Sequence, residues 1–260
     1  MKSIEPSNPE HDDCTTKKIR EFWSENVNAE RIMDKNVSEH KRGQEGYFSD
    51  LEQQRYRSHQ HLIPWIKSMT PGKSVLEIGC GIGLDSFTIA KHGMLLTSMD
   101  LTDIGVNTAK NRFNTQGVSG SFLAANACTL PFKDHSFDYI YSFGVLHHVA
   151  DTKQSIKEVY RVLHTNGEAL IMLYNRISLN ELIHRITRIP FEEKSKLCPV
   201  VRRYSKTEIK DLFHDFSSVD IQLEYVYGEG YGKIFRFTPR WLYKILSHYL
   251  GWHIMIRATK

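Results

Sequence analysis

The stretch VLEIGCGIG at residues 75–83 decides the fold of this chain. A short apolar, β-branched run, typical of a buried strand, leads into three glycines, and a helical pattern begins directly afterwards. Glycine lets the backbone come close to a ligand at points where a side chain would collide with it. The first N–H groups of a helix favour an anionic or polar ligand. We therefore expect a strand, a ligand-binding turn and a helix here.

Short apolar runs and helical patterns alternate further along the chain. Further strand-like runs occupy residues 95–100, 121–126, 137–143 and 168–174. After residue 175 come amphipathic helical patterns at 177–189, 205–216 and 239–250, and strand-like runs at 219–228 and 253–258. Strands that alternate with helices are the signature of an α/β fold with a mainly parallel sheet. We predict a Rossmann-like, seven-stranded, mostly parallel sheet with helices on both faces.

Composition limits the class of protein. The 260 residues are 40% hydrophobic and 25% charged, which suits one soluble domain with a sizeable core. No apolar run approaches 18 residues, and the first residues lack the pattern of a secretory signal, so we expect no membrane insertion. The four cysteines are widely spaced without a CxxC pair, which argues against a disulfide scaffold or a thiolate zinc site. This cysteine usage fits a reducing compartment, and we predict a cytoplasmic protein.

The charge pattern gives only a weak indication of a partner. The net charge is +4, but the basic residues are dispersed among 30 acidic ones. Nucleic-acid binders usually concentrate their basic residues on one face, so nucleic acid is not the first expectation. No feature of the sequence indicates an oligomeric state.

The glycine turn does not match the common nucleotide motifs. A dinucleotide fingerprint would place its third glycine at Leu84, and no GK[ST] follows as a phosphate-binding loop requires. Glu77 stands two residues before the first glycine, where a carboxylate would repel a pyrophosphate and suit a cationic ligand. Asp100 ends the next strand, which is where α/β cofactor folds place the acid that binds ribose hydroxyls.

With these motifs in order, the sequence resembles the class I S-adenosylmethionine-dependent methyltransferases of small molecules. The turn reads ExGxGxG, and NACTLPF at 126–132 with FDYI at 137–140 is similar to the family's D-A-x-x-L-P-F and F-D stretch. SFGVLHHVAD at 142–151 and RVLHTNGEALI at 161–171 also resemble family segments. The resemblance covers roughly residues 70–175. It implies S-adenosylmethionine as the cofactor and S-adenosylhomocysteine as the product.

The sequence departs from the family pattern at two places. Asn126 stands where an aspartate is usual, although an amide oxygen can still accept a bond from the adenine amino group. The segment HTNG at 164–167 replaces the usual Pro-Gly-Gly turn.

The resemblance implies a role for each residue of the glycine turn. The backbone at Gly79, Gly81 and Gly83 is expected to pass close to the methionine part and the ribose. Glu77 either organises the loop or binds the cofactor's amino group through water. Cys80 belongs to the same cofactor-binding segment, as a small buried filler.

The resemblance also implies contacts for residues after the later strands. Asp100 is expected to bind both ribose hydroxyls, and Leu101 to pack on adenine. The remaining expected contacts come from Asn126 and Ala127 at the adenine edge, and from Ser142 or Phe143 at the methionyl end.

His147 and His148 are expected to face the methyl group or the substrate. One of them is the best candidate for a general base, because a histidine pKa lies near working pH. Packing or capping is an alternative role for either ring. The pair could also form a metal site with Asp151, but the resemblance explains it without a metal, and we predict none.

Substrate choice should come from segments outside the sheet. In similar enzymes an N-terminal helical lid covers the cofactor, and Tyr47, Arg55 and Tyr56 are candidates to meet its carboxylate. Tyr47 could instead only hold the lid to the core. The predicted organisation is a flexible tail at 1–18, a helical lid at 19–70, a cofactor-binding core at 71–176, an inserted cap at 177–216, and C-terminal strands and helix at 217–260 that complete the sheet.

The sequence favours an enzyme that methylates a small-molecule metabolite, such as an aromatic, isoprenoid or polyketide-like compound. It does not favour an O, N or C acceptor atom. The alternatives are a methyltransferase acting on tRNA or protein, and a non-catalytic regulatory protein that binds S-adenosylmethionine. A nicotinamide oxidoreductase is disfavoured by Leu84 and Glu77.

Overall fold

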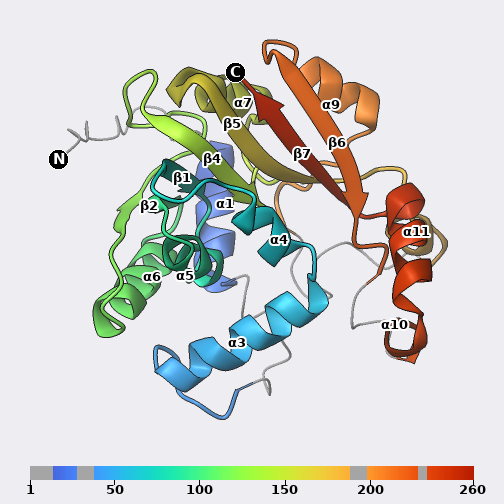
Figure 1. Ribbon diagram of the computed structural model, residues 1–260, viewed down its shortest axis with the longest axis horizontal. Coiled ribbons are helices and arrows are strands. Elements are labelled where there is room, and N and C mark those ends of the chain that lie inside the picture. Colours follow the sequence, from blue (N-terminus) through green and yellow to red (C-terminus); the bar gives the residue numbers. More distant parts are fainter. Residues whose placement is uncertain (1–13, 28–37, 188–197, 228–232) are drawn as a thin grey trace.

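The computed structural model describes residues 14–27, 38–187, 198–227 and 233–260. Seven strands form one sheet in the order β3-β2-β1-β4-β5-β7-β6 (Figure 1). Strand pairs are parallel except those of β7, which runs antiparallel to both β5 and β6. The strands are β1 (Ser74–Ile78), β2 (Leu95–Asp100), β3 (Ser121–Ala124), β4 (Phe137–Phe143), β5 (Leu163–Tyr174), β6 (Ser218–Glu224) and β7 (His253–Thr259). The predicted mostly parallel seven-stranded sheet is confirmed.

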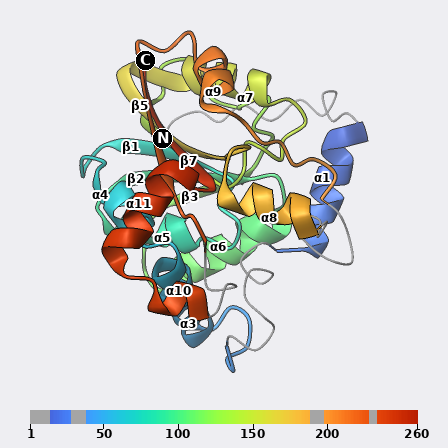
Figure 2. The same ribbon diagram turned by 90° about the vertical axis from the view of Figure 1, so that its right-hand side faces the viewer.

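Helices cover both faces of the sheet, and three of the described helices precede the first strand in the chain. Figure 2 shows α7 and α9 on one side of the sheet and α5 and α6 on the other. The helices are α1 (Cys14–Glu25), α3 (Glu45–Ser58), α4 (Leu62–Lys67), α5 (Leu84–Lys91), α6 (Asp103–Thr115), α7 (Thr152–Val162), α8 (Leu179–Thr187), α9 (Lys206–Leu212), α10 (Lys233–Phe237) and α11 (Arg240–Leu250).

Neighbouring residues of the central strands point to opposite faces, as the two-residue period of a strand requires. Val75 packs in a cluster with Ile89 of α5, whereas Leu76 packs in another with Val159 of α7. Both residues are fully buried. Strands buried on both faces read as continuous apolar runs, which is why the first strand is so plain in the sequence.

The strand order reverses between β1 and β4. The chain runs outward from β1 to β2 and β3, and then returns to β4 on the other side of β1. At such a switch point the loops after the two central strands leave in opposite directions and open a crevice at the carboxyl edge. The glycine turn follows β1 directly, so the topology places it at this crevice.

The ends of several elements differ from their predicted positions. Residues 1–13 of the predicted tail lie outside the described residues, and residues 14–18 form the start of α1. The described residues of the predicted lid contain the rest of α1 and two further helices, α3 and α4, which are separated at His59–His61. Pro64 fits inside the first turn of α4, where backbone N–H groups have no helical partner.

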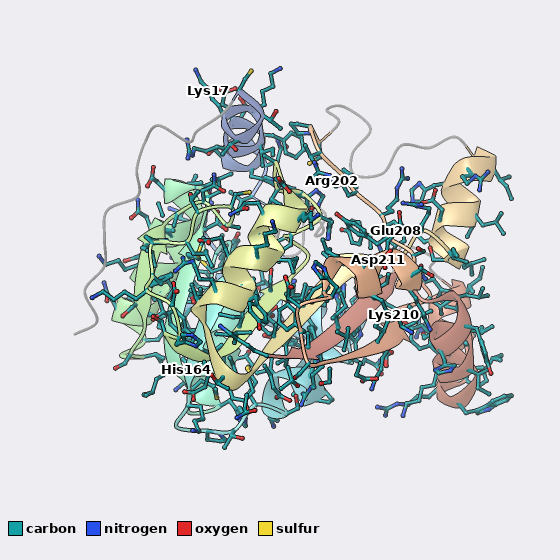
Figure 3. All side chains as sticks on the ribbon, turned by 90° about the horizontal axis from the view of Figure 1, so that it is seen from above. Lys17, His164, Arg202, Glu208, Lys210 and Asp211 are labelled. Atoms are coloured by element: carbon teal, nitrogen blue, oxygen red, sulfur yellow. The ribbon has the colours of Figure 1, made fainter. Side chains whose placement is uncertain are left out.

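The predicted cap at 177–216 contains α8 and α9, while its residues 188–197 lie outside the described part. Ile209 and Phe213 pack on the sheet, so α9 belongs to the layer that carries α7. A capping box begins α9, in which Ser205 and Glu208 each bond to the other's backbone N–H. Figure 3 shows Arg202 on the segment that leads to α9. Its guanidinium donates to the carbonyls of Val149 and Ala150, and so ties this segment to the loop after β4.

Two further observations concern the described residues alone. None of their helices is long and apolar enough to cross a membrane. No group of three or more histidine, cysteine, aspartate or glutamate side chains in this part of the chain could hold a metal ion.

Candidate cofactor site

A cavity lies at the carboxyl edge of the sheet, between the turns that follow β1, β2 and β4. Thr16, Ile19 and Trp23 of α1 close it from outside, and the Arg20 Nε donates to the Leu101 carbonyl at 3.2 Å. Eleven of the fifteen predicted site residues line this cavity: Arg55, Glu77, Gly79, Cys80, Gly81, Asp100, Leu101, Asn126, Ala127, Phe143 and His148.

The glycine turn has a backbone that only glycine adopts without strain. Gly79, Gly81 and Gly83 have φ angles of 81°, 50° and 82°, in the left-handed region. A Cβ on Gly79 would lie 2.2 Å from the Val145 side chain, and one on Gly83 would lie 2.8 Å from the Ala109 Cβ. A Cβ on Gly81 would meet nothing within 4 Å, because it would point into open space. Gly81 thus leaves room for a ligand, whereas Gly79 and Gly83 leave room for the side chains of Val145 and Ala109.

Asp100 ends β2 and faces the same turn. One carboxylate oxygen accepts from the Gly81 N–H at 2.9 Å, and the other accepts from the Thr102 N–H and hydroxyl at 2.8 and 2.7 Å. Burial raises the pKa of Asp100, and these hydrogen bonds oppose the rise. Each carboxylate oxygen has two lone pairs, so the oxygen bonded to Gly81 can accept one further bond from a ligand hydroxyl, while the other oxygen already accepts two bonds.

Asn126 and Ala127 follow β3 and form another part of the cavity wall. The Asn126 side-chain oxygen accepts from the Cys128 N–H at 2.9 Å, which shapes the turn. Within the described part of the chain, no acceptor lies within hydrogen-bond range of the Ala127 N–H. A backbone donor without a partner beside a cavity is suited to a ligand acceptor such as a ring nitrogen.

Glu77 is buried inside the turn and is held by two serines. Its carboxylate accepts from the Ser86 hydroxyl, and from the Ser98 hydroxyl at 2.7 Å. Burial and the nearby Asp85 charge raise the pKa of Glu77 to about 7. These bonds join β1 to β2 and α5, so Glu77 fixes the shape of the turn. Burial also raises the pKa of the neighbouring Cys80 thiol well above its usual value, so Cys80 is protonated.

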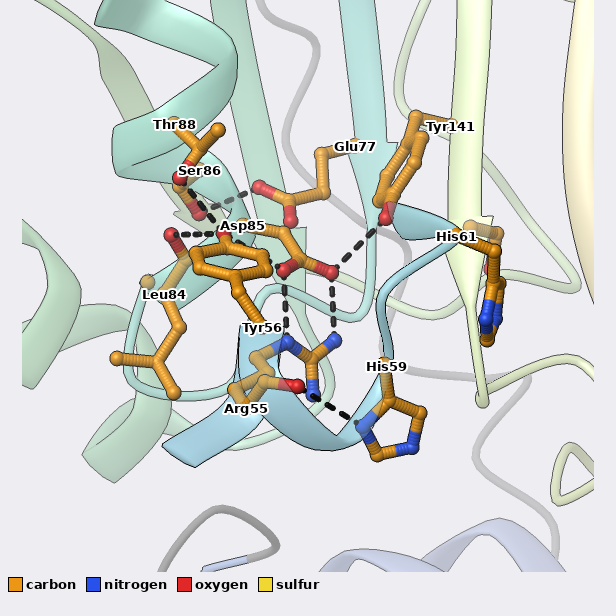
Figure 4. A network of polar contacts seen from close by, with 12 residues as sticks. Arg55, Tyr56, His59, His61, Glu77, Leu84, Asp85, Ser86, Thr88 and Tyr141 are labelled. Carbon is orange, nitrogen blue, oxygen red and sulfur yellow. Dashed lines mark hydrogen bonds and ion pairs between the residues drawn. The ribbon is translucent and has the colours of Figure 1, made fainter. Parts of the chain in front are cut away.

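Arg55 enters the cavity from α3 and pairs with Asp85 in the first turn of α5 (Figure 4). The pair is bidentate, with nitrogen–oxygen distances of 2.7 and 2.5 Å. The hydroxyls of Tyr141 and Tyr56 also donate to Asp85, at 2.9 and 3.1 Å. Burial works to lower the pKa of Arg55 and raise that of Asp85, but the pairing and these hydrogen bonds outweigh burial. Both groups are therefore charged, and both line the cavity.

The two predicted histidines have different surroundings. His148 lines the cavity, and its Nδ1–H donates to the Val200 carbonyl at 2.7 Å. His147 is fully buried behind the cavity wall, with its ring centroid 3.7 Å from that of Tyr174. Neither ring nitrogen of His147 has a partner among the described residues. Burial and the neighbouring His148 lower the pKa of His147 well below its usual value, so its ring is neutral.

Three other predicted residues also lie outside the cavity wall. Gly83 occupies the N-cap position of α5, in the left-handed conformation. The Ser142 hydroxyl donates to the Ile78 carbonyl at 3.1 Å and is buried between the strands. Tyr47 packs with Phe48, next to the residues that follow the turn, which agrees with the alternative in which it holds the lid to the core.

Other cavity residues were absent from the sequence-based prediction, chiefly Trp23, Asp85 and Tyr141. Asp85 directly follows the glycine motif, and an acid in the first turn of a helix normally indicates only favourable interaction with the helix dipole. Its charged state at the cavity depends on Arg55, thirty positions away. No local pattern connects the two residues.

Comparisons with known proteins agree with this geometry. Residues 76–171 match the family model described as "Methyltransferase domain". The sheet order and the glycine turn agree with a methyltransferase domain in this part of the chain.

Individual relatives are similar over the core alone. The chain is 33% identical over 110 residues to cycloartenol-C-24-methyltransferase 1 of Oryza sativa. The matched region covers 41% of this chain and 32% of that protein. It is 31% identical over 105 residues to a ubiquinone biosynthesis O-methyltransferase of Coxiella burnetii. This matched region covers 40% of this chain and 45% of that protein. The chain thus matches less than half the length of these relatives.

A solved structure extends the similarity in fold beyond the core. The PH0226 protein of Pyrococcus horikoshii superposes with a TM-score of 0.59 at 17% identity, covering 92% of this chain and 98% of that one. The arrangement of helices and strands outside residues 76–171 is therefore also found in another protein.

Proposed function

We propose that this chain transfers a methyl group from S-adenosylmethionine to a small, apolar metabolite. The observation that carries the proposal is the two-ended character of the cavity. One end offers a carboxylate and a backbone donor for a nucleoside, and the other offers a buried pair of opposite charges. A ligand with a nucleoside at one end and an amino-acid zwitterion at the other matches both ends.

The nucleoside end would hold ribose and adenine. Asp100 would accept from a ribose hydroxyl through the oxygen that also accepts from Gly81, and the Ala127 N–H would donate to a ring nitrogen. Asn126 would accept from the adenine amino group through its remaining lone pair. Leu101 and Ile19 would enclose the ring between the loop after β2 and α1.

The Arg55–Asp85 pair would hold the amino-acid end. A guanidinium recognises a carboxylate through its N–H donors, and the negative charge of Asp85 would attract the ammonium group. The pair is neutral as a whole, so it suits a zwitterion better than an anion. When bound, S-adenosylmethionine supplies a methyl group on a sulfonium, which is reactive without further activation. The protein's main task is then to align this end and to exclude water.

The acceptor would approach beside Phe143, where rings from several elements gather. Tyr225 stacks with His59 and His253, with ring centroids 4.5 Å apart in both cases. The His253 ring is also 5.2 Å from that of Phe143. Burial lowers the pKa values of His59 and His253, so both rings are neutral. Phe143 lines the cavity and these uncharged rings pack near it, so this side of the cavity would favour an apolar or planar acceptor. The names of the two relatives also point to apolar metabolites.

His148 is the group best suited to take a proton from an acceptor hydroxyl or amine. Its Nδ1–H is engaged with Val200, which fixes the tautomer whose Nε2 can accept. His147 would support His148 by packing against it, with ring centroids 4.2 Å apart.

The first test is binding of S-adenosylhomocysteine by calorimetry. We expect affinity in the micromolar range for the wild type and none for Asp100→Ala. Heat from NADH but not from S-adenosylhomocysteine would contradict the proposal. The second test incubates cell extract with the enzyme and radiolabelled S-adenosylmethionine, and identifies the labelled product by mass. Label that enters only RNA or protein would exclude a small-molecule acceptor.

A further inference from the structure

Large apolar side chains on the outer face of α10 and α11 are unusually exposed. Phe237, Trp241, Ile245 and Tyr249 expose 73%, 65%, 49% and 69% of their surface. The last three are spaced by four residues on α11 and therefore form one row on the helix. We call these four residues the apolar row. Isolated exposed apolar residues are normal, but an aligned row of this size marks an interaction surface.

A second row of side chains accompanies the first. Arg236, Arg240, Lys244 and His248 each directly precede a member of the apolar row. We call them the basic row. Arg240 and Lys244 are exposed, and neither forms an ion pair with any described residue. Three members of the row also line a groove between α11, α4 and the sheet, together with Arg257 and the carboxylates of Asp220 and Glu224.

The inner face of α11 is fixed to the rest of the protein by hydrogen bonds, so the helix holds its outer rows in a defined position. The Ser247 hydroxyl accepts from the Val226 N–H at 3.2 Å, and the Tyr243 hydroxyl donates to the Tyr227 carbonyl at 3.0 Å. Figure 1 shows α11 beside β6 at the edge of the sheet, and Figure 2 shows α8 on the same side of the molecule. α8 exposes Leu182 and Ile186, which add apolar surface there.

We propose that this side of the molecule docks on an anionic phospholipid membrane through the outer face of α10 and α11. The apolar row would enter the interface between headgroups and acyl chains, and the basic row would contact lipid phosphates. A helix with an apolar aromatic side next to a cationic side is the form that lies in a membrane surface without crossing it. Phe, Trp and Tyr are suited to that interface because it is apolar on one side and wet on the other.

Charge favours this occupant over a second copy of the chain. Arg236, Arg240 and Lys244 of the basic row follow the apolar row along the helices, so a partner with negative charge along that length is favoured. An anionic bilayer does so, and each basic residue near its surface contributes about 1 kcal/mol. The docking face is independent of the proposed methyl transfer, and its test needs neither cofactor nor acceptor.

The test is co-sedimentation of the full chain with vesicles. We expect binding to vesicles of phosphatidylcholine with about one-third phosphatidylglycerol, and at least ~10-fold weaker binding to phosphatidylcholine alone. Trp241→Ala with Ile245→Ala should abolish binding. The matched control is Leu95→Ala, because Leu95 is 65% exposed on β2, away from this face, and it should bind as the wild type does.

The charge contribution is tested separately. Replacing both Arg240 and Lys244 with serine should weaken binding to the anionic vesicles about 25-fold, at about fivefold for each charge. Replacing Lys110 and Lys157 removes the same net charge from exposed positions on α6 and α7 and should have little effect. Equal binding by both double variants would overturn the proposal. The proposal would also be overturned if the wild-type chain did not bind anionic vesicles but formed a concentration-dependent dimer that Trp241→Ala with Ile245→Ala abolished.

Discussion

Replacing Gly81 with alanine separates cofactor binding from folding. The Gly81 φ angle of 50° is in the left-handed region, and a Cβ there would meet no atom within 4 Å. The protein should therefore fold, with a loss of about 1–2 kcal/mol from backbone strain. In a chain of this size that corresponds to a fall in melting temperature of roughly 2–8 °C. The new methyl group would, however, occupy the space that the proposed ligand needs.

The assay pairs calorimetry with thermal unfolding. We expect Gly81→Ala to bind S-adenosylhomocysteine at least tenfold more weakly than the wild type, which corresponds to about 1.4 kcal/mol or more. Gly117→Ala is the matched control, because Gly117 also has a left-handed φ of 62° and nothing within 4 Å of a built Cβ, but it lies in the turn after α6. It should lose similar stability and keep full affinity. If both variants bind alike, the backbone at Gly81 is not part of the binding surface.

Two further predictions concern buried charge. Arg55→Met should lower the free energy of unfolding by about 3–5 kcal/mol, because it leaves the buried Asp85 carboxylate without its cation. The double variant Arg55→Met with Asp85→Asn should recover much of the lost free energy of unfolding, measured in urea. A double variant no more stable than Arg55→Met alone would argue against the pairing. The pKa of His59 is about 3 in the folded protein and 6.5 as its ordinary value, so its contribution is complete above pH 6.5 and is lost as the pH falls towards 3. Between pH 7 and 5 the cost is about 2 kcal/mol, while Glu77, with its pKa raised to about 7, changes stability in the opposite direction. His59→Phe should therefore reduce the acid loss of stability by about 2 kcal/mol in unfolding measured at both pH values, and an unchanged pH dependence would refute burial as the cause.

The core of the fold could be predicted because its signals are local. β4 begins and ends at the residues predicted from the sequence, since its apolar run is buried on both faces and bounded by polar residues. β5 begins at Leu163, five residues before its predicted start, directly after α7 ends. Asn166 adopts a left-handed φ of 62° within that strand. A pattern based on apolar residues does not detect a strand whose first part is the polar sequence HTNG.

The position of the cavity residues at the carboxyl edge was predictable for the same reason, whereas the Arg55–Asp85 pair was only half predictable, because Asp85 was not a candidate. Gly81, Asp100 and Asn126 each follow a strand directly, so a parallel sheet brings them to one edge whatever the rest of the chain does. Arg55 was a candidate through resemblance, but its charge is useful only where Asp85 balances it. A lone buried guanidinium would attract any anion, and a paired one presents both signs at once. The proposed selectivity of the Arg55–Asp85 pair for a zwitterion therefore depends on how α3 packs against α5. That packing is a tertiary contact, and it explains why the specificity of this site is harder to deduce from sequence than its location.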